Sequence, residues 1–441
     1  MLEKLRKLIQ KKGWKEMGEI GIKFPPHDFS LVLEETQKGT RNKILSQLSF
    51  KMLVKLLPEL SEEVKGGFIG SLTSQKAAEL LSKIPSDEIV DILQNIPVKK
   101  RTEILREFSK EKIEEVTFLL KYPPKTAGGL MTTEFIALNE EISVQETIRY
   151  IREKAKDHPV YHVYIVDDKR RLVGVLSLRQ LILANPKEKL KYIMQAEVIK
   201  VLPKTDQERA ANLITDYNLL ALPVVDKEDK ILGIVTADDA MEVMEEEASE
   251  DIALMSGTTP VDSLVGVPAN LMVKARLPWL IIGLMGGIVA AWIVGFFEHT
   301  LSSYITLAMF MPVLVYMSDA MGTQSETITI RAMALEPKFR IKKYFLRELK
   351  IGFAIAIICG TIISLAVALG WGPPLFGLII GISMFLGILV VTFFATSLPF
   401  LLKKLNIDPA LAAGPFATII SDIVTLVIYF SVASLMMRYF L

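Results

Sequence analysis

Almost all the charged side chains of this 441-residue chain precede Arg276. Residues 276–441 hold 18 of the 101 Asp, Glu, Lys and Arg residues, and the other 83 come before them. A soluble domain needs a charged surface, whereas a segment that crosses a lipid bilayer must be almost entirely apolar. We therefore expect a soluble half followed by a membrane-spanning half, which excludes a wholly soluble enzyme.

The overall composition narrows the class further. The formal net charge of +1 argues against a general nucleic-acid binder, which needs a basic domain. The single cysteine, Cys359, excludes a disulfide framework and a thiolate metal cluster. The first residues are rich in charge and contain no apolar stretch of the signal-peptide kind, so we expect a basic helix at residues 1–27 and a cytoplasmic soluble half.

A short repeat follows the basic segment. Its six units start at positions 43, 55, 67, 79, 91 and 103, and each has apolar residues at its second, third and sixth positions. This pattern is typical of one face of a helix, and a unit of this length holds about two helical turns and a corner. Because such short helices cannot bury an apolar face alone, we expect residues 28–127 to form an all-α superhelix. It would serve as a scaffold or as a regulatory surface.

Two segments of the soluble half are copies of each other. Residues 162–182 and 221–241 match at an offset of 59, and each contains a strand, a charged turn, a second strand and a helix. This α+β pattern resembles a tandem pair of cystathionine-β-synthase (CBS) domains, which we place at residues 128–192 and 193–240.

The CBS resemblance implies one nucleotide site. In that family a T-x-x-D motif binds the ribose of an adenine nucleotide, and Thr236 and Asp239 match it in the second copy. The first copy has Ser177 and Gln180 at these positions and lacks the carboxylate. Two interpretations stay open, namely ATP binding at Thr236 and Asp239 or a purely structural role for this pair.

An acidic stretch connects the second CBS copy to the membrane half. Residues 231–273 contain nine Asp or Glu residues and no Lys or Arg. Carboxylates without neighbouring His or Cys favour hard cations such as Mg²⁺ and Ca²⁺. We expect a connecting helix at 241–273 that acts as a divalent-cation switch, with an ordinary solvated acidic face as the alternative. Apolar residues at helical spacing are expected to pack on one face, and these are Met241, Met244, Ala248, Ile252 and Met255.

Five apolar segments of the transmembrane part, residues 274–441, are long enough to cross a bilayer, which takes about 20 helical residues. They lie at 277–297, 303–325, 350–371, 375–401 and 409–437. Seven Lys and Arg residues fall at 331–350 and none at 298–304. By the positive-inside rule we expect a multi-pass protein of the plasma membrane with a cytoplasmic N-terminus and an outside C-terminus.

Asp422 is the one charged residue of the last predicted span and lies close to its centre. An Asp in the middle of a bilayer costs roughly 2.5–3.5 kcal/mol, so we expect it to face a hydrated pathway, or else to be neutral and hydrogen-bonded. Pro415 is expected to free the Leu411 carbonyl and give an oxygen-rich site with Thr418, or only to kink the helix. Two such carboxylates in a two-fold dimer would balance the charge of one divalent cation.

Longer motifs give the chain a family resemblance. They are YPPKTAGGLMTTEFIAL (122–138), RLPWL (276–280), MGTQS (321–325) and DPALAAGPFATIISD (408–422). Over almost its whole length the chain resembles the MgtE family of magnesium channels. The resemblance implies a homodimer in membrane lipid, with a central Mg²⁺ pore at Asp422 and with Asp408 near its cytoplasmic mouth.

The same resemblance implies a regulatory site. In the family, cytoplasmic Mg²⁺ bound between the N-terminal domain, the CBS pair and the acidic "plug" helix holds the pore closed. The acidic positions that would bind this Mg²⁺ are Asp226, Asp238, Asp239, Glu242, Glu245, Glu246 and Glu247.

One position departs from the family pattern. Many members have an asparagine in the second span where this chain has Ala320, and Asp319 is added beside it. Asp319 is expected either to face the pore as a further metal ligand or to pair with Arg276 or Arg331.

The departure keeps two alternatives to a Mg²⁺-selective channel open. One is a transporter or exporter of Mg²⁺ or of another divalent ion such as Co²⁺ or Mn²⁺, with or without ion coupling. The other is a non-transporting membrane sensor of Mg²⁺ or nucleotide. An enzyme is not expected, because the four histidines are scattered and neither an H-E-x-x-H motif nor a P-loop occurs.

Overall fold

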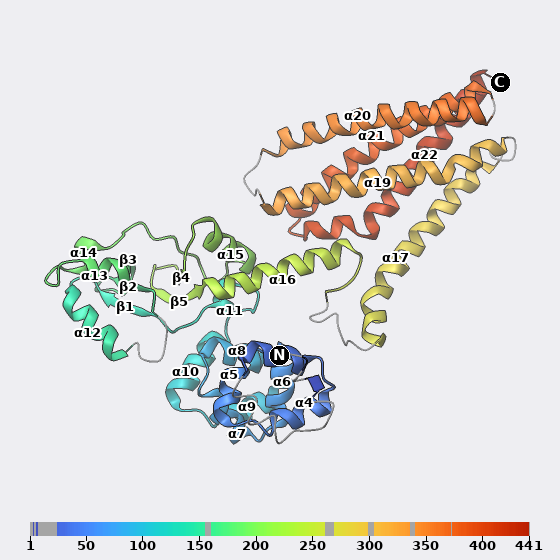
Figure 1. Cartoon of the computed structure of the whole chain (residues 1–441). Coiled ribbons are helices and arrows are strands. Elements are labelled where there is room, and N and C mark those ends of the chain that lie inside the picture. Colours follow the sequence, from blue (N-terminus) through green and yellow to red (C-terminus); the bar gives the residue numbers. More distant parts are fainter. Residues whose placement is uncertain are drawn as a thin grey trace. The chain divides into compact units, whose positions relative to one another are not determined.

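A computed structural model gives the fold of the chain (Figure 1). It describes residues 3, 6, 7, 24–154, 160–260, 269–298, 304–335, 340–371 and 373–440. The basic helix predicted at residues 1–27 lies almost wholly outside the described residues. The chain divides into two compact units, Met1–Glu247 and Ala248–Leu441.

The first unit begins with short helices whose starts are evenly spaced along the chain. In the part that the structure describes they are α3 (Pro26–Glu34), α4 (Lys38–Leu45), α5 (Phe50–Leu56), α6 (Glu62–Ser71), α7 (Ser74–Leu81), α8 (Ser86–Gln94), α9 (Val98–Leu105) and α10 (Lys110–Leu119). The predicted all-α repeat is thus confirmed and extends beyond the six units found in the sequence. Helices two apart pack together, as α6 does with α8 and α7 with α9, so the structural repeat is a pair of helices.

Capping residues start these helices at fixed points. The hydroxyls of Ser49, Thr73 and Ser109 accept hydrogen bonds from the backbone N–H groups of Met52, Lys76 and Lys112. Prolines directly precede α8 and α9. Since a hydroxyl cap satisfies an N–H group that has no partner inside its helix, the regular spacing of these residues sets the spacing of the helices.

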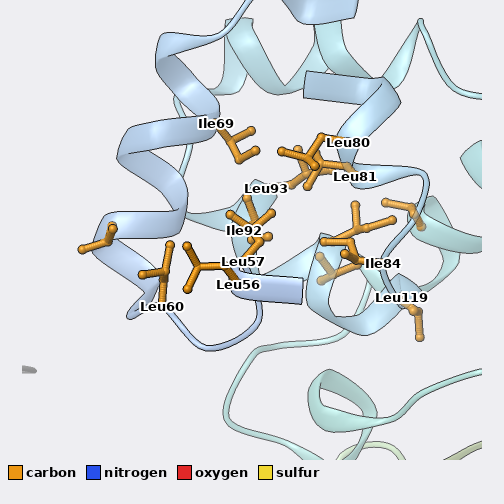
Figure 2. Packing of buried hydrophobic residues seen from close by; sticks show 14 of the residues in the cluster. Leu56, Leu57, Leu60, Ile69, Leu80, Leu81, Ile84, Ile92, Leu93 and Leu119 are labelled. Carbon is orange, nitrogen blue, oxygen red and sulfur yellow. The ribbon is translucent and has the colours of Figure 1, made fainter. Parts of the chain in front are cut away.

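The apolar positions of the repeat form one core. Leu56, Leu57, Leu81, Ile92 and Leu93 are each at most 1% exposed, and Figure 2 shows them converging from different helices. Removing this apolar surface from water stabilises helices that are too short to persist alone.

Two α/β modules complete the first unit. The first module consists of α11 (Ala127–Leu130), β1 (Ile136–Asn139), α12 (Val144–Lys154), β2 (His162–Val166), β3 (Leu172–Ser177), α13 (Leu178–Leu183) and α14 (Leu190–Ile193). The second consists of α15 (Gln207–Asp216), β4 (Ala221–Val225), β5 (Ile231–Thr236) and the first turns of α16 (Ala237–Met255). Strand β1 is parallel to β2, whereas the pairs β2–β3 and β4–β5 are antiparallel.

The predicted offset of 59 holds for the antiparallel strand pair and the following helix of each module, whereas the preceding helices α12 and α15 start at Val144 and Gln207. The strand starts agree with it, and so do Arg170 and Asp229, which have positive φ in the two hairpin turns. A parallel bridge between Val201 and Val224 takes the place in the second module that β1 has in the first. The tandem CBS architecture is therefore confirmed.

The acidic connecting helix differs from the prediction in extent and in its buried face. It runs from Ala237 to Met255, and residues 261–268 lie outside the described part. Ala240 and Val243 are 1% and 2% exposed, whereas Met241 is 66% exposed. The predicted packing face is therefore wrong, because the helix continues directly from β5, which turns Ala240 and Val243 toward the core of the second module.

The second unit contains five helices that are long and apolar enough to span a membrane, counted over the described residues. They are α17 (Ala269–Phe296), α19 (Ile305–Leu335), α20 (Ile341–Gly370), α21 (Pro374–Lys404) and α22 (Pro415–Phe440). Helix α21 packs against α19, α20 and α22. The Tyr429 hydroxyl on α22 donates a 2.7 Å hydrogen bond to the Leu307 carbonyl on α19. The number and order of the predicted spans are confirmed.

The last span begins later than predicted. Residues Pro409–Ala413 form a 3₁₀ helix, η2, and α22 starts at Pro415. Proline is favoured in the first turn because its missing N–H is not needed there, so the kink predicted at Pro415 is wrong. Asp422 is consequently the eighth residue of α22, about 10 Å from its start, and not central in the helix. The role predicted for the Leu411 carbonyl stays a prediction.

Candidate functional site

Three predicted metal-binding residues of the membrane unit come together between α19 and α22. The Asp319 carboxylate is hydrogen-bonded to the Thr418 hydroxyl. Asp422, one helical turn after Thr418 on α22, lies within electrostatic range of Asp319. The packing of α19 against α22 thus places two carboxylates and one hydroxyl near each other, an oxygen-only group of the kind that hard cations prefer.

The alternative pairing of Asp319 with an arginine is not observed. The partner that acts on its carboxylate is Thr418, and among the described residues neither Arg276 nor Arg331 forms an ion pair with it. Carboxylates in an apolar layer without a cationic partner are costly unless water or a metal ion compensates them. The geometry is therefore that of a hydrated or ion-binding position.

Asp408 lies in the segment that precedes α22. It is exposed and caps η2, with its Oδ1 accepting a 2.8 Å hydrogen bond from the Ala410 N–H. The role predicted for it at the pore mouth stays a prediction.

A second group of carboxylates lies in the first unit, where α8 approaches the start of α16. Asp239 accepts hydrogen bonds from the hydroxyl and the N–H of Thr236. Burial raises the pKa of Asp239 to about 7, and the charges of Asp87 and Asp238 add to this rise. The pKa of Glu88 is also raised, chiefly by burial and in addition by the nearby charge of Glu242.

The α8 side of this group was missed by the sequence analysis. Burial raises the pKa of Asp87 to about 6, although its carboxylate is hydrogen-bonded to Thr132. Burial, and then the charges of Glu62, Glu88 and Asp87, raise the pKa of Asp91 to about 8. The only signal in the sequence was the i, i+4 spacing of Asp87 and Asp91, which puts both on one helix face.

Two observations show that the group is short of positive charge. Lys65 is shared between Glu62 and Glu88, at 2.8 and 3.1 Å, and within the described residues Asp87, Asp91 and Asp239 have no ion pair with a lysine. The Oδ1 atom of Asp87 is buried and has no hydrogen-bond partner in the same part of the chain. A cation would therefore find acceptors here that nothing else satisfies.

The carboxylates do not form a ready-made metal centre. Within the described ranges no three Asp, Glu, His or Cys side chains converge closely enough to hold a metal ion. Like charges repel at short range, so a cation would have to draw these side chains together.

Several predicted ligands lie apart from this group. Asp226 Oδ1 accepts hydrogen bonds of 2.9 and 2.8 Å from the N–H groups of Glu228 and Lys230, which shapes the β4–β5 turn. The Glu247 carboxylate accepts a 2.6 Å hydrogen bond from Gln207. Glu245 and Glu246 lie exposed along α16, and Glu242 is exposed there too but lies close enough to the group to affect the pKa of Glu88.

Comparison with known proteins identifies the family. The chain matches the models of the divalent cation transporter MgtE at residues 311–432, of the MgtE intracellular N domain at 24–125, and of the CBS domain at 127–187 and 190–246. It is 39% identical over 330 residues to the magnesium transporter MgtE of Thermus thermophilus, which is 74% of this chain and 73% of that protein. This chain belongs to the MgtE family.

Further relatives extend the MgtE match to nearly the whole chain. The magnesium transporter MgtE of Bacillus subtilis is 32% identical over 412 residues, 93% of this chain and 91% of that protein. A crystal structure of the cytosolic domain of a Mg²⁺ channel MgtE in complex with ATP is 33% identical, with a TM-score of 0.51, and covers 55% of this chain and all of that one. The chain is thus a membrane protein of a magnesium-transporter family, a family of transporters rather than enzymes.

The MgtE chain also has a ligand-sized cavity beside the carboxylates of its first unit. It measures about 550 Å³ and is lined by Asp87, Tyr164, Thr236 and Asp239 among others, a size typical of small-molecule sites. Thr236 and Asp239 are hydrogen-bonded to each other in the first turn of α16, as Ser177 and Gln180 are in α13. The pair therefore caps its helix, and its hydroxyl and carboxylate also line the cavity.

Proposed function

We propose that two copies of this chain form a homodimeric Mg²⁺ channel with its pore on the two-fold axis. The observation that carries the proposal is the group of Asp319, Thr418 and Asp422, which has no cationic partner among the described residues. Two copies of Asp422 would balance the charge of one divalent ion. Mg²⁺ prefers oxygen ligands and gives up its water reluctantly, so carboxylates and hydroxyls that hold it through water suit its passage.

We further propose that cytoplasmic Mg²⁺ closes this channel. Asp87, Asp91 and Asp239 have raised pKa values because each carboxylate is buried near others. These carboxylates repel one another when they are ionised. A bound divalent cation would neutralise their charges and draw α8 toward the start of α16. The exposed acids of α16, Glu242, Glu245 and Glu246, would contribute further negative charge to the same site, and we retain Asp226, Asp238 and Glu247 as predicted ligands.

The proposed orientation follows the distribution of basic residues. The plasma membrane would hold α17 to α22, with the C-terminus outside and both cytosolic domains in the cytoplasm. We retain the division into a helical domain (28–127), two CBS domains (128–192 and 193–240), a connecting plug segment (241–273) and a transmembrane domain (274–441).

Reversal potentials test the channel proposal. In a planar bilayer that contains the purified chain, the current should reverse at the Mg²⁺ equilibrium potential and should not shift when opposed Na⁺ or H⁺ gradients are imposed. A channel dissipates only the gradient of its own ion, whereas a coupled transporter would move the reversal potential with the second ion. Equal currents with Co²⁺ or Mn²⁺ would contradict Mg²⁺ selectivity, and no current under any gradient would favour a sensor.

A second proposal concerns the 550 Å³ cavity of the cytosolic unit. We propose that it binds ATP through Thr236 and Asp239, since both line the cavity and the related cytosolic domain of known structure is in complex with ATP.

Substituting Thr236 tests this ATP site. In calorimetric titrations of the full chain, Thr236→Val should weaken ATP binding about tenfold, because the variant keeps the shape of the side chain and loses its hydroxyl. Ser177→Ala is the matched control, because Ser177 caps the equivalent helix of the first module. Equal losses in both variants, or no loss in Thr236→Val, would contradict the assignment.

A further inference from the structure

Glu326 is a buried carboxylate that has no part in the proposals for the pore, for its closure by Mg²⁺ or for ATP binding. It lies in α19 and is 0% exposed. Both of its carboxylate oxygens lack a hydrogen-bond partner among the described residues. An ionised carboxylate in such a place costs several kcal/mol unless a proton or a cation neutralises it.

A small cavity adjoins this side chain inside the subunit. It has a volume of about 40 Å³ and lies between α19, α21 and α22. Its polar lining comes from Asp319, Thr323, Glu326 and Ser421, and its apolar lining comes mainly from α21. Because one water needs roughly 10–15 Å³ of such space, the cavity has room for about three waters or for an ion with a partial water shell.

The surroundings of the cavity are short of hydrogen-bond partners. Ser421 is 4% exposed, and its hydroxyl has no partner in the described part of the chain. At Gly322, a Cβ atom would lie 2.8 Å from Val391 Cγ1 and 3.9 Å from Ser421 Oγ. The glycine therefore keeps open the space that a larger residue would fill.

A cation accounts for these observations better than a proton. A protonated Glu326 would be expected to donate to a nearby acceptor, yet within the described ranges neither of its oxygens has a partner. A hydrated cation would compensate Glu326 and the nearby Asp319 together, and its waters would reach the Ser421 hydroxyl. Two carboxylates match the charge of one divalent ion, and the polar side chains of the lining offer only oxygen atoms, the ligands that Mg²⁺ prefers.

We propose that Glu326, together with Asp319, binds one Mg²⁺ inside each subunit, at a position beside that of Asp422 on the dimer axis. Asp319 adjoins both positions, so Glu326 is the carboxylate that distinguishes this one. The residues that line the cavity lie on α19, α21 and α22 of the same chain. The proposal rests on the proposed function only in taking the transported ion, Mg²⁺, as the ligand.

Counting bound ions in the full-length protein tests this site. After equilibrium dialysis against saturating Mg²⁺, atomic absorption should find about one ion fewer per chain in Glu326→Gln and in Asp319→Asn than in the unaltered protein. The cytosolic sites contribute equally to all variants, so the difference reports the membrane unit alone. Glu348→Gln is the matched control, since Glu348 is 3% exposed in α20 and lies 3.5 Å from Arg347, and its count should not change.

Stoichiometry separates the new site from the pore. Two Asp422 side chains would share one ion on the axis, so Asp422→Asn should lower the number of bound ions by about one half per chain. The double variant Asp422→Asn with Glu326→Gln should lose the sum of the two single losses. If the double variant loses no more than one of the single variants, the two positions share one ion and the inference is overturned.

The other possible results of the ion counts also support or overturn the proposed site. Unchanged counts in both Glu326→Gln and Asp319→Asn would overturn the inference and assign a proton to Glu326. If Glu326→Gln does not fold, Asp319→Asn is tested in the Asp422→Asn background, where the axial ion is already lost and a further loss of about one ion per chain can come only from the site at Glu326. If these variants bind fewer ions but the unaltered protein carries no Mg²⁺ current, the site inside the subunit is supported and the channel proposal is rejected. If the current is normal but the variants bind as many ions as the unaltered protein, the channel proposal is supported and this site is rejected.

Discussion

Replacing Asp422 with asparagine is expected to reduce Mg²⁺ flux into liposomes by at least about 100-fold. The change removes two negative charges from each proposed dimer pore while keeping the shape of the side chain. Without these carboxylates a divalent ion must enter the apolar layer uncompensated, and a loss of roughly 2.7 kcal/mol corresponds to a 100-fold effect. Flux is measured with a Mg²⁺ indicator inside the vesicles.

Glu348→Gln serves as the control for Asp422→Asn. It also removes a carboxylate from the membrane unit, but Glu348 lies in α20, away from the group at Asp319. Its flux should stay close to that of the unaltered protein. If Asp422→Asn retains a comparable flux while remaining folded, the pore assignment is wrong.

Removing two carboxylates of the first unit is expected to weaken the proposed closure by Mg²⁺. The double variant Asp91→Asn with Asp239→Asn should need at least about tenfold more cytoplasmic Mg²⁺ to reach half-maximal closure. Both residues have raised pKa values because they are buried near other carboxylates, on α8 and α16 respectively. Losing two of the charges removes much of the attraction for a divalent ion. The measurement is channel current against the Mg²⁺ concentration on the cytoplasmic side.

Proton competition gives the feedback prediction a second readout. The pKa values of Asp87, Asp239 and Asp91 are about 6, 7 and 8, so protons occupy these carboxylates as the pH falls through that range. The Mg²⁺ concentration needed for closure should therefore rise from about pH 8 to about pH 6 and should rise less in the double variant. Asp216→Asn, at an exposed position of α15, is the control. Unaltered closure in the double variant would place the sensor elsewhere, with the triple variant of Glu245, Glu246 and Glu247 as the next candidate.

Periodicity predicted most of the fold because it depends on local physics. Capping residues and apolar positions recur at a constant spacing, so each helix of the first domain is specified by its own few residues. The offset of 59 between the CBS modules is equally local, since it fixes equivalent strands and turns. The membrane spans were predicted by their apolar length alone.

Features that depend on tertiary contact were predicted less well. Pro415 was expected to lie inside a helix, because apolar length does not show that a 3₁₀ turn at Pro409–Ala413 separates it from the preceding segment. The buried face of α16 depends on how β5 leads into the helix. Asp87 and Asp91 were missed because the sequence does not show that α8 approaches α16. Glu326 was passed over because the predicted second span ended at residue 325, whereas α19 continues to Leu335.

The pairwise packing of the repeated short helices bears on how the protein is made. Most helices of the series contact the helix after next, as α5 does with α7, so this domain has short loops to close and should fold fast. It also leaves the ribosome well before the apolar helices appear. A compact domain can therefore exist while the rest of the chain is still being synthesised, which keeps its buried leucines away from the apolar segments that follow.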